Sequence, residues 1–574
     1  MASAGGSRQV RSVRWLLSGL LGIFGCGDRH LTAILPPGSD AGPSAGAGGQ
    51  APQSPDACGA SEGQGAGPLP PMGWNGWNAF GCGPELDQAK FLANADALVA
   101  RGLADVGYQY MNLDDCWQSG RGSDGFVIPN ATRFPDGIGA LGDYVHERGL
   151  KLGIDSCSSG CQRAELRTPG SLGYEAQDAQ RYAEWGVDFV KYTGSGASAA
   201  GERADFEAMR DALTETGRPM LFSIVNAPFK YWHSEVGQMW RTHPDIQPSF
   251  ANVLEVVDVT SKLAAYAGQG GYNDADMLWI GNPGLSEPES RAVFALWSIL
   301  ASPLLAGNDL TAMSAFTQAT LTNREVIALN QDELRLQGAL LGTQGDVSVY
   351  AKPLAECGAR GVVLLNRGNA AAEASVAWQE LGLLPGEASV RELWAGVDWP
   401  VARDAVSVTV GPHDAVALRI VGSEPPLPRG TVYLSDLPWS YAVNGWGPIE
   451  RDQELGGDAQ GDGGALTLGG ITYEKGLGTN SPALVRYRLG QVCRELQAVI
   501  GIDDSTGDSG SAVFQVWADG EKLFDSGVIT GATEPRPISV DVSGRNEMRL
   551  FVGEVDDFGL DHGNWADALL VCDE

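Results

Sequence analysis

The sequence predicts a (β/α)₈ barrel followed by an antiparallel β-sandwich and a C-terminal all-β domain. The chain has 574 residues, which is too long for one domain. Its first half alternates eight short apolar runs with amphipathic helical stretches over roughly 250 residues, the pattern of an α/β barrel. Beyond residue 331 the pattern changes to short alternating strands without helices. We therefore place the barrel at residues 70–340, the sandwich at 341–422 and the last domain at 430–574.

The residues before the barrel predict export. Three arginines precede a short apolar run that ends just before Cys26, and this run is too short to span a membrane. We predict a signal peptide over residues 1–26, either of the lipoprotein type, with Cys26 as the lipidated first residue, or of the ordinary secretory type. A flexible linker rich in Ala, Gly, Pro and Ser is expected over residues 27–69. The protein is thus expected to be exported, as a cell-surface lipoprotein or a secreted protein.

Eight strand-like runs make up the predicted barrel. They cover residues 72–78, 108–115, 151–156, 188–193, 220–226, 239–245, 271–277 and 303–309. Helical stretches lie between them, with apolar residues at spacings of three and four. Examples are residues 84–101, 175–185, 202–216 and 287–301. The sandwich is predicted from strands at 347–351, 361–365, 374–378, 390–394, 406–410 and 415–420.

Charged or polar side chains stand at the C-terminal ends of most predicted barrel strands. They are Asp114, Asp115, Asp155, Lys191, Asn226, Arg241, Asp245, Asp274, Asp276, Asn308 and Asp309. A barrel gathers these strand ends on one face, which is where active sites of this fold lie. Polar residues can also simply end strands, but a charged group at most of eight ends favours a functional site.

Composition excludes some partners. Acidic residues outnumber basic ones by 71 to 39, which gives a formal net charge of -32. Such a charge repels phosphate backbones, so nucleic-acid binding is not expected. The nine cysteines show no paired C-x-x-C spacing, so no structural metal is predicted. In an exported protein disulfides are expected instead, and Cys493 with Cys572 would staple the last domain.

A collinear set of motifs runs through the predicted barrel. It comprises PMGWNGWN at 71–78, NLDDCW at 112–117, FPDGI at 134–138, KLGI at 151–154, PGSLGYE at 169–175, WGVD at 185–188, WRT at 240–242, NDADML at 273–278 and SPLL at 302–305. This set resembles the retaining α-galactosidases of glycoside hydrolase family 27. The resemblance implies hydrolysis of terminal α-galactosides with two carboxylates and no cofactor.

The resemblance also assigns roles to individual residues. It implies that Asp245 is the general acid/base that protonates the glycosidic oxygen. Asp114 and Asp115 match the carboxylates that bind the O4 and O6 hydroxyls of galactose, with charge-assisted hydrogen bonds. Further sugar contacts are implied for Trp77, Lys191, Asn226, Arg241, Asp276 and Met277. Cys82 and Cys116 match a disulfide of the family, and Cys157 and Cys161 are close enough to pair locally.

The chain departs from the family at the nucleophile. The family motif is Lys-Tyr-Asp-x-Cys, whereas this chain has Lys191-Tyr192-Thr193-Gly194-Ser195, so Thr193 occupies the nucleophile position. A Thr hydroxyl without an adjacent base is a poor substitute for a carboxylate. One strand earlier, Asp155 replaces the tyrosine of the family. Three alternatives follow: Asp155 acts as nucleophile or base, the barrel binds galactosides without turnover, or Asp155 only hydrogen-bonds Thr193.

The second departure concerns the 2-position of the sugar. The family has Cys-Glu-Trp after the fifth strand, with Glu contacting O2, and this chain has Val225-Asn226-Ala227. A neutral residue here leaves galactose and N-acetylgalactosamine both open. The alternatives to an α-galactosidase are therefore a non-catalytic galactoside-binding protein and an α-N-acetylgalactosaminidase-like enzyme.

The last domain resembles the carbohydrate-binding module abbreviated NPCBM. The matching stretches include YLSDLPW at 433–439, NGWGP at 444–448, YEKGLG at 473–478, FQVWADG at 514–520 and WADA at 565–568. A β-sandwich whose loops display Trp and Asp suits sugar faces and hydroxyls, although many of these Trp residues belong in the core. Acidic loops such as Asp503-Asp504 and Asp556-Asp557 can hold Ca²⁺, but oxygen-rich loops are common and no metal site is predicted from them. The expected partner is an α-galactoside oligosaccharide or polysaccharide, with membrane contact only through a lipid on Cys26.

Overall fold

The computed structural model describes residues 68–159, 162–163, 166–167, 169–194, 201–226, 228–268, 270–555 and 559–574. The predicted signal peptide and all but the last two residues of the predicted linker lie outside the described residues. Cys26, Cys58, Cys161, Asp556 and Asp557 lie outside them as well. Across the described ranges, none of the helices combines the length and the apolar character that a membrane crossing requires.

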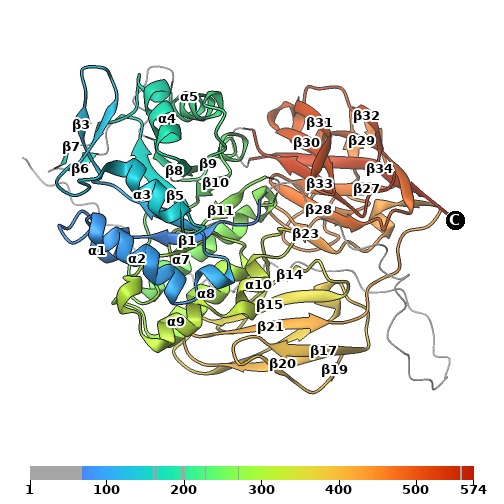
Figure 1. Cartoon of the computed structure of the whole chain (residues 1–574). Helices are drawn as coiled ribbons and strands as arrows, with labels where there is room; N and C mark the ends of the chain where they lie inside the picture. Colours follow the sequence, from blue (N-terminus) through green and yellow to red (C-terminus); the bar gives the residue numbers. More distant parts are fainter. Residues whose placement is uncertain are drawn as a thin grey trace, which may run out of the picture. The chain divides into compact units, whose positions relative to one another are not determined.

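Eight parallel strands form the sheet of the first domain, drawn in blue to green in Figure 1. Their order is β11-β10-β9-β8-β5-β2-β1-β12. Their bounds are β1 Met72–Asn75, β2 Tyr110–Leu113, β5 Lys151–Cys157, β8 Val187–Thr193, β9 Leu221–Val225, β10 Met239–Arg241, β11 Tyr272–Asp274 and β12 Leu304–Ala306. An isolated parallel bridge between Leu278 and Ala306 connects the two ends of this order. The predicted α/β barrel is confirmed.

Helices alternate with these strands as predicted. They are α1 Trp77–Phe80, α2 Gln88–Ala100, α3 Gly137–His146, α4 Glu175–Glu184, α5 Glu202–Glu215, α6 His233–Val236, α7 Phe250–Thr260, α8 Glu287–Ile299, α9 Ala315–Leu321 and α10 Arg324–Asn330. Two short hairpins, β3 Gln118–Arg121 with β4 Val127–Pro129 and β6 Gln162–Arg163 with β7 Leu166–Arg167, add to the loops.

The interior of the barrel explains why polar side chains collect at the strand ends. Phe189, Met239, Met277 and Leu305 pack together in a small buried cluster contributed by four strands or their extensions. Side chains alternate between the two faces of a strand, so Lys191 and Thr193 lie on the same face as Phe189 and nearer the end of β8. Along β8, the buried apolar residue Phe189 is thus followed on the same face by the polar residues Lys191 and Thr193.

The second domain is the predicted antiparallel sandwich. One sheet contains β13 Ala339–Gln344, β14 Val347–Pro353, β15 Ala359–Asn366, β21 Ala415–Val421, β17 Glu387–Glu392, β18 Val397–Asp398 and β19 Ala402–Arg403. The other pairs β16 Ala372–Ala377 with β20 Ala405–Val410. Alternating side chains such as Val347, Val349, Val406 and Val408 enclose a core around the fully buried Trp378.

The third domain is all-β, with two antiparallel sheets around its own core. One sheet holds β22 Thr431–Tyr433, β24 Glu450–Arg451, β27 Gly476–Asn480, β29 Cys493–Ile502, β32 Arg536–Asp541 and β34 His562–Cys572. The other holds β23 Tyr441–Val443, β28 Ala483–Arg488, β30 Ser511–Ala518, β31 Glu521–Thr530 and β33 Glu547–Gly553. The hairpin of β25 Thr467–Leu468 and β26 Ile471–Thr472 adds to them. The predicted disulfide between Cys493 and Cys572 is confirmed and joins the paired strands β29 and β34.

Two acidic residues of this domain have structural partners that argue against a Ca²⁺ loop. Asp503 accepts hydrogen bonds from the Thr467 backbone N–H and from the Asn564 side chain. Asp504 accepts from the backbone N–H groups of Gly469 and Gly470. The two carboxylates therefore hold the β25–β26 hairpin, and their oxygens are already used by backbone donors.

Candidate functional site

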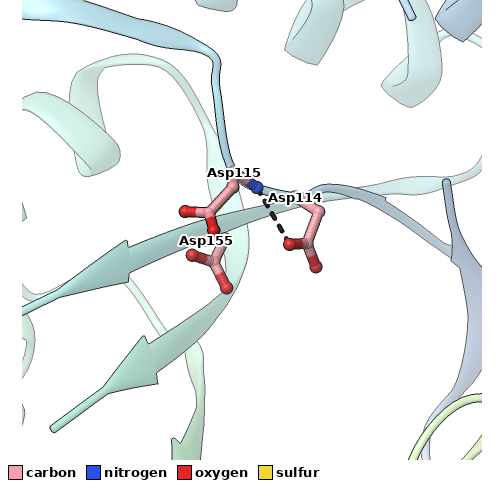
Figure 2. Close-up of side chains that lie close together, drawn as sticks. All are labelled: Asp114, Asp115 and Asp155. Carbon is pink, nitrogen blue, oxygen red and sulfur yellow. Dashed lines mark hydrogen bonds between the residues drawn. The ribbon is translucent and has the colours of Figure 1, made fainter. Parts of the chain in front are cut away.

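Lys191 stands between two buried carboxylates at the end of the barrel strands. Its Nζ lies 2.7 Å from Oδ2 of Asp114 and 3.0 Å from Oδ2 of Asp155. Asp114 also accepts from the Asn75 side chain at 2.6 Å and from the Asp115 backbone N–H at 2.9 Å. Figure 2 shows the carboxylates of Asp114, Asp115 and Asp155 gathered at the ends of neighbouring strands. The structure thus brings four of the predicted site residues together.

The two carboxylates beside Lys191 respond differently to the same burial. Burial disfavours the ionised form of Asp114, but the Lys191 ammonium and the hydrogen bonds from Lys191, Asn75 and Asp115 outweigh it and lower its pKa. Burial raises the pKa of Asp155 well above its ordinary value, Lys191 opposes the rise, and the charges of Asp114 and Asp115 add to it. Burial likewise works against the charge of Lys191, yet the attraction of Asp114 and Asp155 raises its pKa. Asp114 is therefore the preferred anionic partner of Lys191.

Three carboxylate oxygens of Asp114, Asp115 and Asp155 lie within 4.8 Å of one another, a spacing that also suits a metal ion. The Lys191 ammonium already supplies a positive charge between two of these carboxylates. A bound cation would have to compete with this fixed ammonium, so the cluster suits hydroxyl groups of a neutral sugar better than a metal.

A second charged cluster surrounds Arg241 at the end of β10. Its Nη1 donates to Asp276 at 2.7 Å and to Asp245 at 3.1 Å, and its Nε donates to Asp274 at 3.3 Å. Asp274 and Asp276 are buried, whereas the side chain of Asp245 is 64% exposed. Arg241 therefore binds the exposed carboxylate of Asp245, the predicted acid/base, and is itself bound by the buried carboxylates of Asp274 and Asp276.

Asp276 adopts a backbone conformation that is unusual for a residue with a side chain. Its φ is 77°, and its Oδ2 accepts from the Ile246 backbone N–H at 2.8 Å while its carbonyl accepts from Trp297 Nε1 at 2.6 Å. Strained backbone of this kind persists where the surroundings fix it, and it is common at functional sites. The contacts tie Asp276 to the segment that carries Asp245.

Thr193 is the last residue of β8, and the strand register separates it from Asp155. Asp155 pairs with Lys191, whereas Thr193 pairs with Cys157 on one side and Val225 on the other. Thr193 therefore lies two residues nearer the strand end than Asp155. In the described part of the chain no hydrogen bond joins their side chains, so the proposed Asp155–Thr193 bond is not found, and Asp155 is paired with Lys191 instead.

Sequence reasoning missed a carboxylate beside the end of β9, the strand that pairs with β8. Asn226 directly follows β9, and its Nδ2 donates to Oε1 of Glu202, the first residue of α5. The other carboxylate oxygen, Oε2, accepts from the Lys230 ammonium. The available signal was an acidic residue at the start of a predicted helix, and this alone is equally typical of helix capping.

The remaining predicted residues lie around these clusters. Trp77 begins α1, and its backbone N–H donates at 2.9 Å to Oδ1 of Asn75, the same asparagine that supports Asp114. Met277 belongs to the apolar cluster of the barrel interior. Cys82 and Cys116 are disulfide-bonded and tie the loop after α1 to the segment after β2. Cys157 takes part in a disulfide, and so, separately, does Cys357.

The domains match known families over most of the described chain. Residues 69–332 match the family described as alpha galactosidase A, residues 344–420 the alpha galactosidase C-terminal beta sandwich domain, and residues 430–571 the NPCBM/NEW2 domain. An α-galactosidase from Cyamopsis tetragonoloba is 41% identical over 354 residues, 61% of this chain and 85% of that protein. Alpha-galactosidase A from Cellvibrio japonicus is 41% identical over 377 residues, 61% of this chain and 91% of that protein.

Solved structures agree with these matches. The crystal structure of α-galactosidase I from Mortierella vinacea superposes with a TM-score of 0.56 at 31% identity and covers 63% of this chain and 99% of that one. The barrel and the sandwich that follows it conform to this architecture. The chain belongs to the α-galactosidase family, glycoside hydrolase family 27, and carries an additional carbohydrate-binding module of the NPCBM type.

Proposed function

We propose that the chain is a glycoside hydrolase that acts on terminal α-galactosides. One observation carries the proposal: a cluster around Lys191 of β8 suits hydroxyl binding, and a cluster around Arg241 of β10 presents a carboxylate, both in the one barrel sheet with β9 between the two strands. In the first, Lys191 and Asn75 keep Asp114 anionic, and an anionic carboxylate accepts hydrogen bonds from sugar hydroxyls. In the second, Arg241 holds the exposed Asp245, which then protonates the leaving oxygen.

A galacto-configured sugar suits the first cluster. Asp114 and Asp115 are adjacent in sequence and both follow β2, so they reach two neighbouring hydroxyls from one strand end. The relatives named above are α-galactosidases, and they support galactose as the sugar. Asn226 stands where the family has the glutamate that contacts O2 of the sugar. Because Asn226 is neutral, the group at C2 is open, and both galactose and N-acetylgalactosamine substrates are tested.

Thr193 favours a second candidate, a galactoside-binding protein without turnover. Retaining hydrolysis needs a second carboxylate roughly 5–5.5 Å from the acid. Thr193 supplies none, and Asp155, the replacement considered from the sequence, is buried with a raised pKa and an ion pair to Lys191. Both candidates share the sugar contacts, so only turnover separates them.

Release of p-nitrophenol from its α-galactoside by the purified full chain tests the proposal. We expect hydrolysis by the wild type and a loss of about 10²–10⁴-fold in kcat for Asp245→Asn, the range for removal of a general acid/base. The α-N-acetylgalactosaminide is assayed in parallel, and a higher kcat/KM for it would change the assigned substrate. No release by the wild type, with galactose binding measured by calorimetry, would establish the binding protein instead.

We also propose that the mature protein is displayed on the cell surface through a lipid on Cys26. The support is the sequence of residues 1–26 and the presence of disulfides such as Cys82–Cys116 and Cys493–Cys572, which persist in oxidising compartments. Labelling with radioactive palmitate in a bacterial host is expected for the wild type and not for Cys26→Ser. Equal labelling of both, or of neither, would contradict lipidation at this residue.

A further inference from the structure

Glu202 places a carboxylate beside the end of β9, the neighbour of the strand whose end lacks the usual nucleophile. It begins α5, the helix that follows β8, and β8 ends at Thr193. Its Oε1 accepts from Asn226, which follows Val225, and Val225 is the β9 residue that pairs with Thr193. Strand β9 lies between β8 and β10, and β10 leads into Asp245. The carboxylate of Glu202 is therefore held beside the end of β9, the strand between β8 and β10.

Glu202 is better suited than Asp155 to accept a proton from water. Its side chain is 21% exposed, and Lys230 and Asn226 each donate a hydrogen bond to one of its oxygens, so the carboxylate is held in place. Asp155 is 3% exposed, burial raises its pKa, and it shares Lys191 with Asp114. A base must reach water, and of these two carboxylates Glu202 is the more exposed.

The position of Glu202 also indicates the stereochemistry. Asn226, its hydrogen-bond partner, lies one residue further out than the level of Thr193, and one strand residue rises roughly 3.3 Å. The carboxylates of retaining enzymes are roughly 5–5.5 Å apart and those of inverting enzymes roughly 6.5–9.5 Å, because a water stands between the base and the sugar. Glu202 belongs to α5 and not to the end of β8, so it does not occupy the nucleophile position itself, and a base that acts through a water does not need to occupy it.

We propose that Glu202 is the second catalytic carboxylate and acts as the base for a water molecule, so that α-galactosides are hydrolysed with inversion. The proposal rests on the hydrolase function proposed above. The water oxygen bonds to the anomeric carbon as the bond from that carbon to the glycosidic oxygen breaks. Glu202 takes a proton from the water, and Asp245 gives its proton to the leaving oxygen. Exchange with solvent then returns Glu202 to the anion and Asp245 to the acid.

The anomer released by the wild type tests this proposal without any substitution. Proton NMR during rapid hydrolysis of an aryl α-galactoside is expected to show β-galactose first, before mutarotation mixes the anomers. Formation of α-galactose first would overturn the proposal, because it would show retention. A wild type that releases no sugar would refute the hydrolase function itself.

Substitution identifies the residue. Glu202→Gln is expected to lower kcat by about 10²–10⁴-fold while the thermal midpoint and the Kd for galactose stay unchanged. The matched control is Glu235→Gln, which removes a nearby exposed ion pair with Arg203 and should keep wild-type kcat. If the wild type is active and Glu202→Gln hydrolyses at the same rate, the role of Glu202 is refuted while the hydrolase function stands.

A double variant tests the geometry from the opposite direction. Thr193→Asp in the Glu202→Gln background restores a carboxylate at the family position, two residues beyond Lys191 on β8. We expect this variant to recover hydrolysis and to release α-galactose first, because the carboxylate would then attack the sugar directly. Release of β-galactose by this double variant would contradict Glu202 as the inverting base.

Discussion

Lys191 carries one positive charge for two carboxylates, and the chemistry of the site depends on which of them is ionised. Asp114 has a lowered pKa because Lys191 and two further donors outweigh burial, whereas burial dominates at Asp155 and raises its pKa. The two residues share a partner and a degree of burial, yet they have opposite consequences for stability. This contrast makes them a matched pair for mutation.

Asp114→Asn is expected to destabilise the protein at neutral pH. A carboxyl group whose pKa is lowered on folding stabilises the fold above its unfolded pKa, and this contribution disappears as pH falls. Breaking a buried pair by removing one partner costs about 3–5 kcal/mol. Thermal melts from pH 7 down to pH 2 should show a lower Tm for the variant at pH 7 and a gap that narrows once the pH falls below the ordinary Asp value of 3.8. A constant gap would contradict the ionic origin.

Asp155→Asn is expected to leave Tm unchanged or higher at neutral pH. A carboxyl group whose pKa is raised on folding favours the fold below its unfolded pKa, and that contribution is lost as pH rises through the folded value. The amide removes the cost of burying a charge, so the advantage of the variant over wild type should shrink as pH falls. The same series of melts measures it, and a large loss of Tm at pH 7 would show that Asp155 is needed as an anion beside Lys191.

At the level of elements, the sequence predicts where strands lie better than where they end. All eight barrel strands begin within two residues of the predicted runs, because apolar periodicity and strand length define them. The runs predicted at 239–245 and 271–277 end early, at Arg241 and Asp274. Past these points the backbone turns, with Asp276 at a positive φ, to hold Asp245 and Asp276 against Arg241. Periodicity contains no information on such a turn.

The candidate site shows the same division. Most of its residues are predictable because strand ends share one face of the barrel. The Glu202–Asn226 contact is not, because it joins residues of two different elements and depends on how α5 packs beside β9. Strand β13, at the edge of the sandwich sheet, was missed as well, since Gly342 and an irregular register weaken its pattern. Contacts between different elements are not encoded in the periodicity of either element, so only the structure reveals them.

Gly153 in β5 is required by the close approach of β2. It pairs with Asn112, and a Cβ at Gly153 would lie 1.7 Å from the Asn112 Oδ1, which is itself buried. Gly153→Ala should therefore cost about 1–3 kcal/mol of unfolding free energy, the usual cost of overpacking. Gly342→Ala is the control, because a Cβ at Gly342 would meet no heavy atom within 4 Å and the φ of this residue lies outside the left-handed region. Urea unfolding compares the two, and equal midpoints would refute the steric argument.

At the scale of the whole molecule, the carbohydrate-binding module adds a second carbohydrate-directed part to the family architecture. Two of its tryptophans, Trp439 and Trp565, are structural and are buried in its core. Trp446 differs, since 45% of it is exposed and the loop that presents it is held by Asn444, whose Nδ2 donates to the Trp446 carbonyl at 2.8 Å. An exposed aromatic ring on a fixed loop suits stacking against a sugar face.

Trp446→Ala is therefore expected to weaken retention on a polysaccharide without changing hydrolysis of a small substrate. Truncation of an aromatic anchor costs about 1 kcal/mol or more, which is roughly fivefold or more in Kd. Affinity electrophoresis in gels that contain a galactomannan measures the retention, and p-nitrophenol release measures the barrel. Ile471→Ala, also on an exposed side chain of the module, controls for simple loss of apolar surface. Retention by Trp446→Ala equal to that of wild type would show that the module binds through another surface, whereas a parallel loss of hydrolysis would show that Trp446 supports the fold.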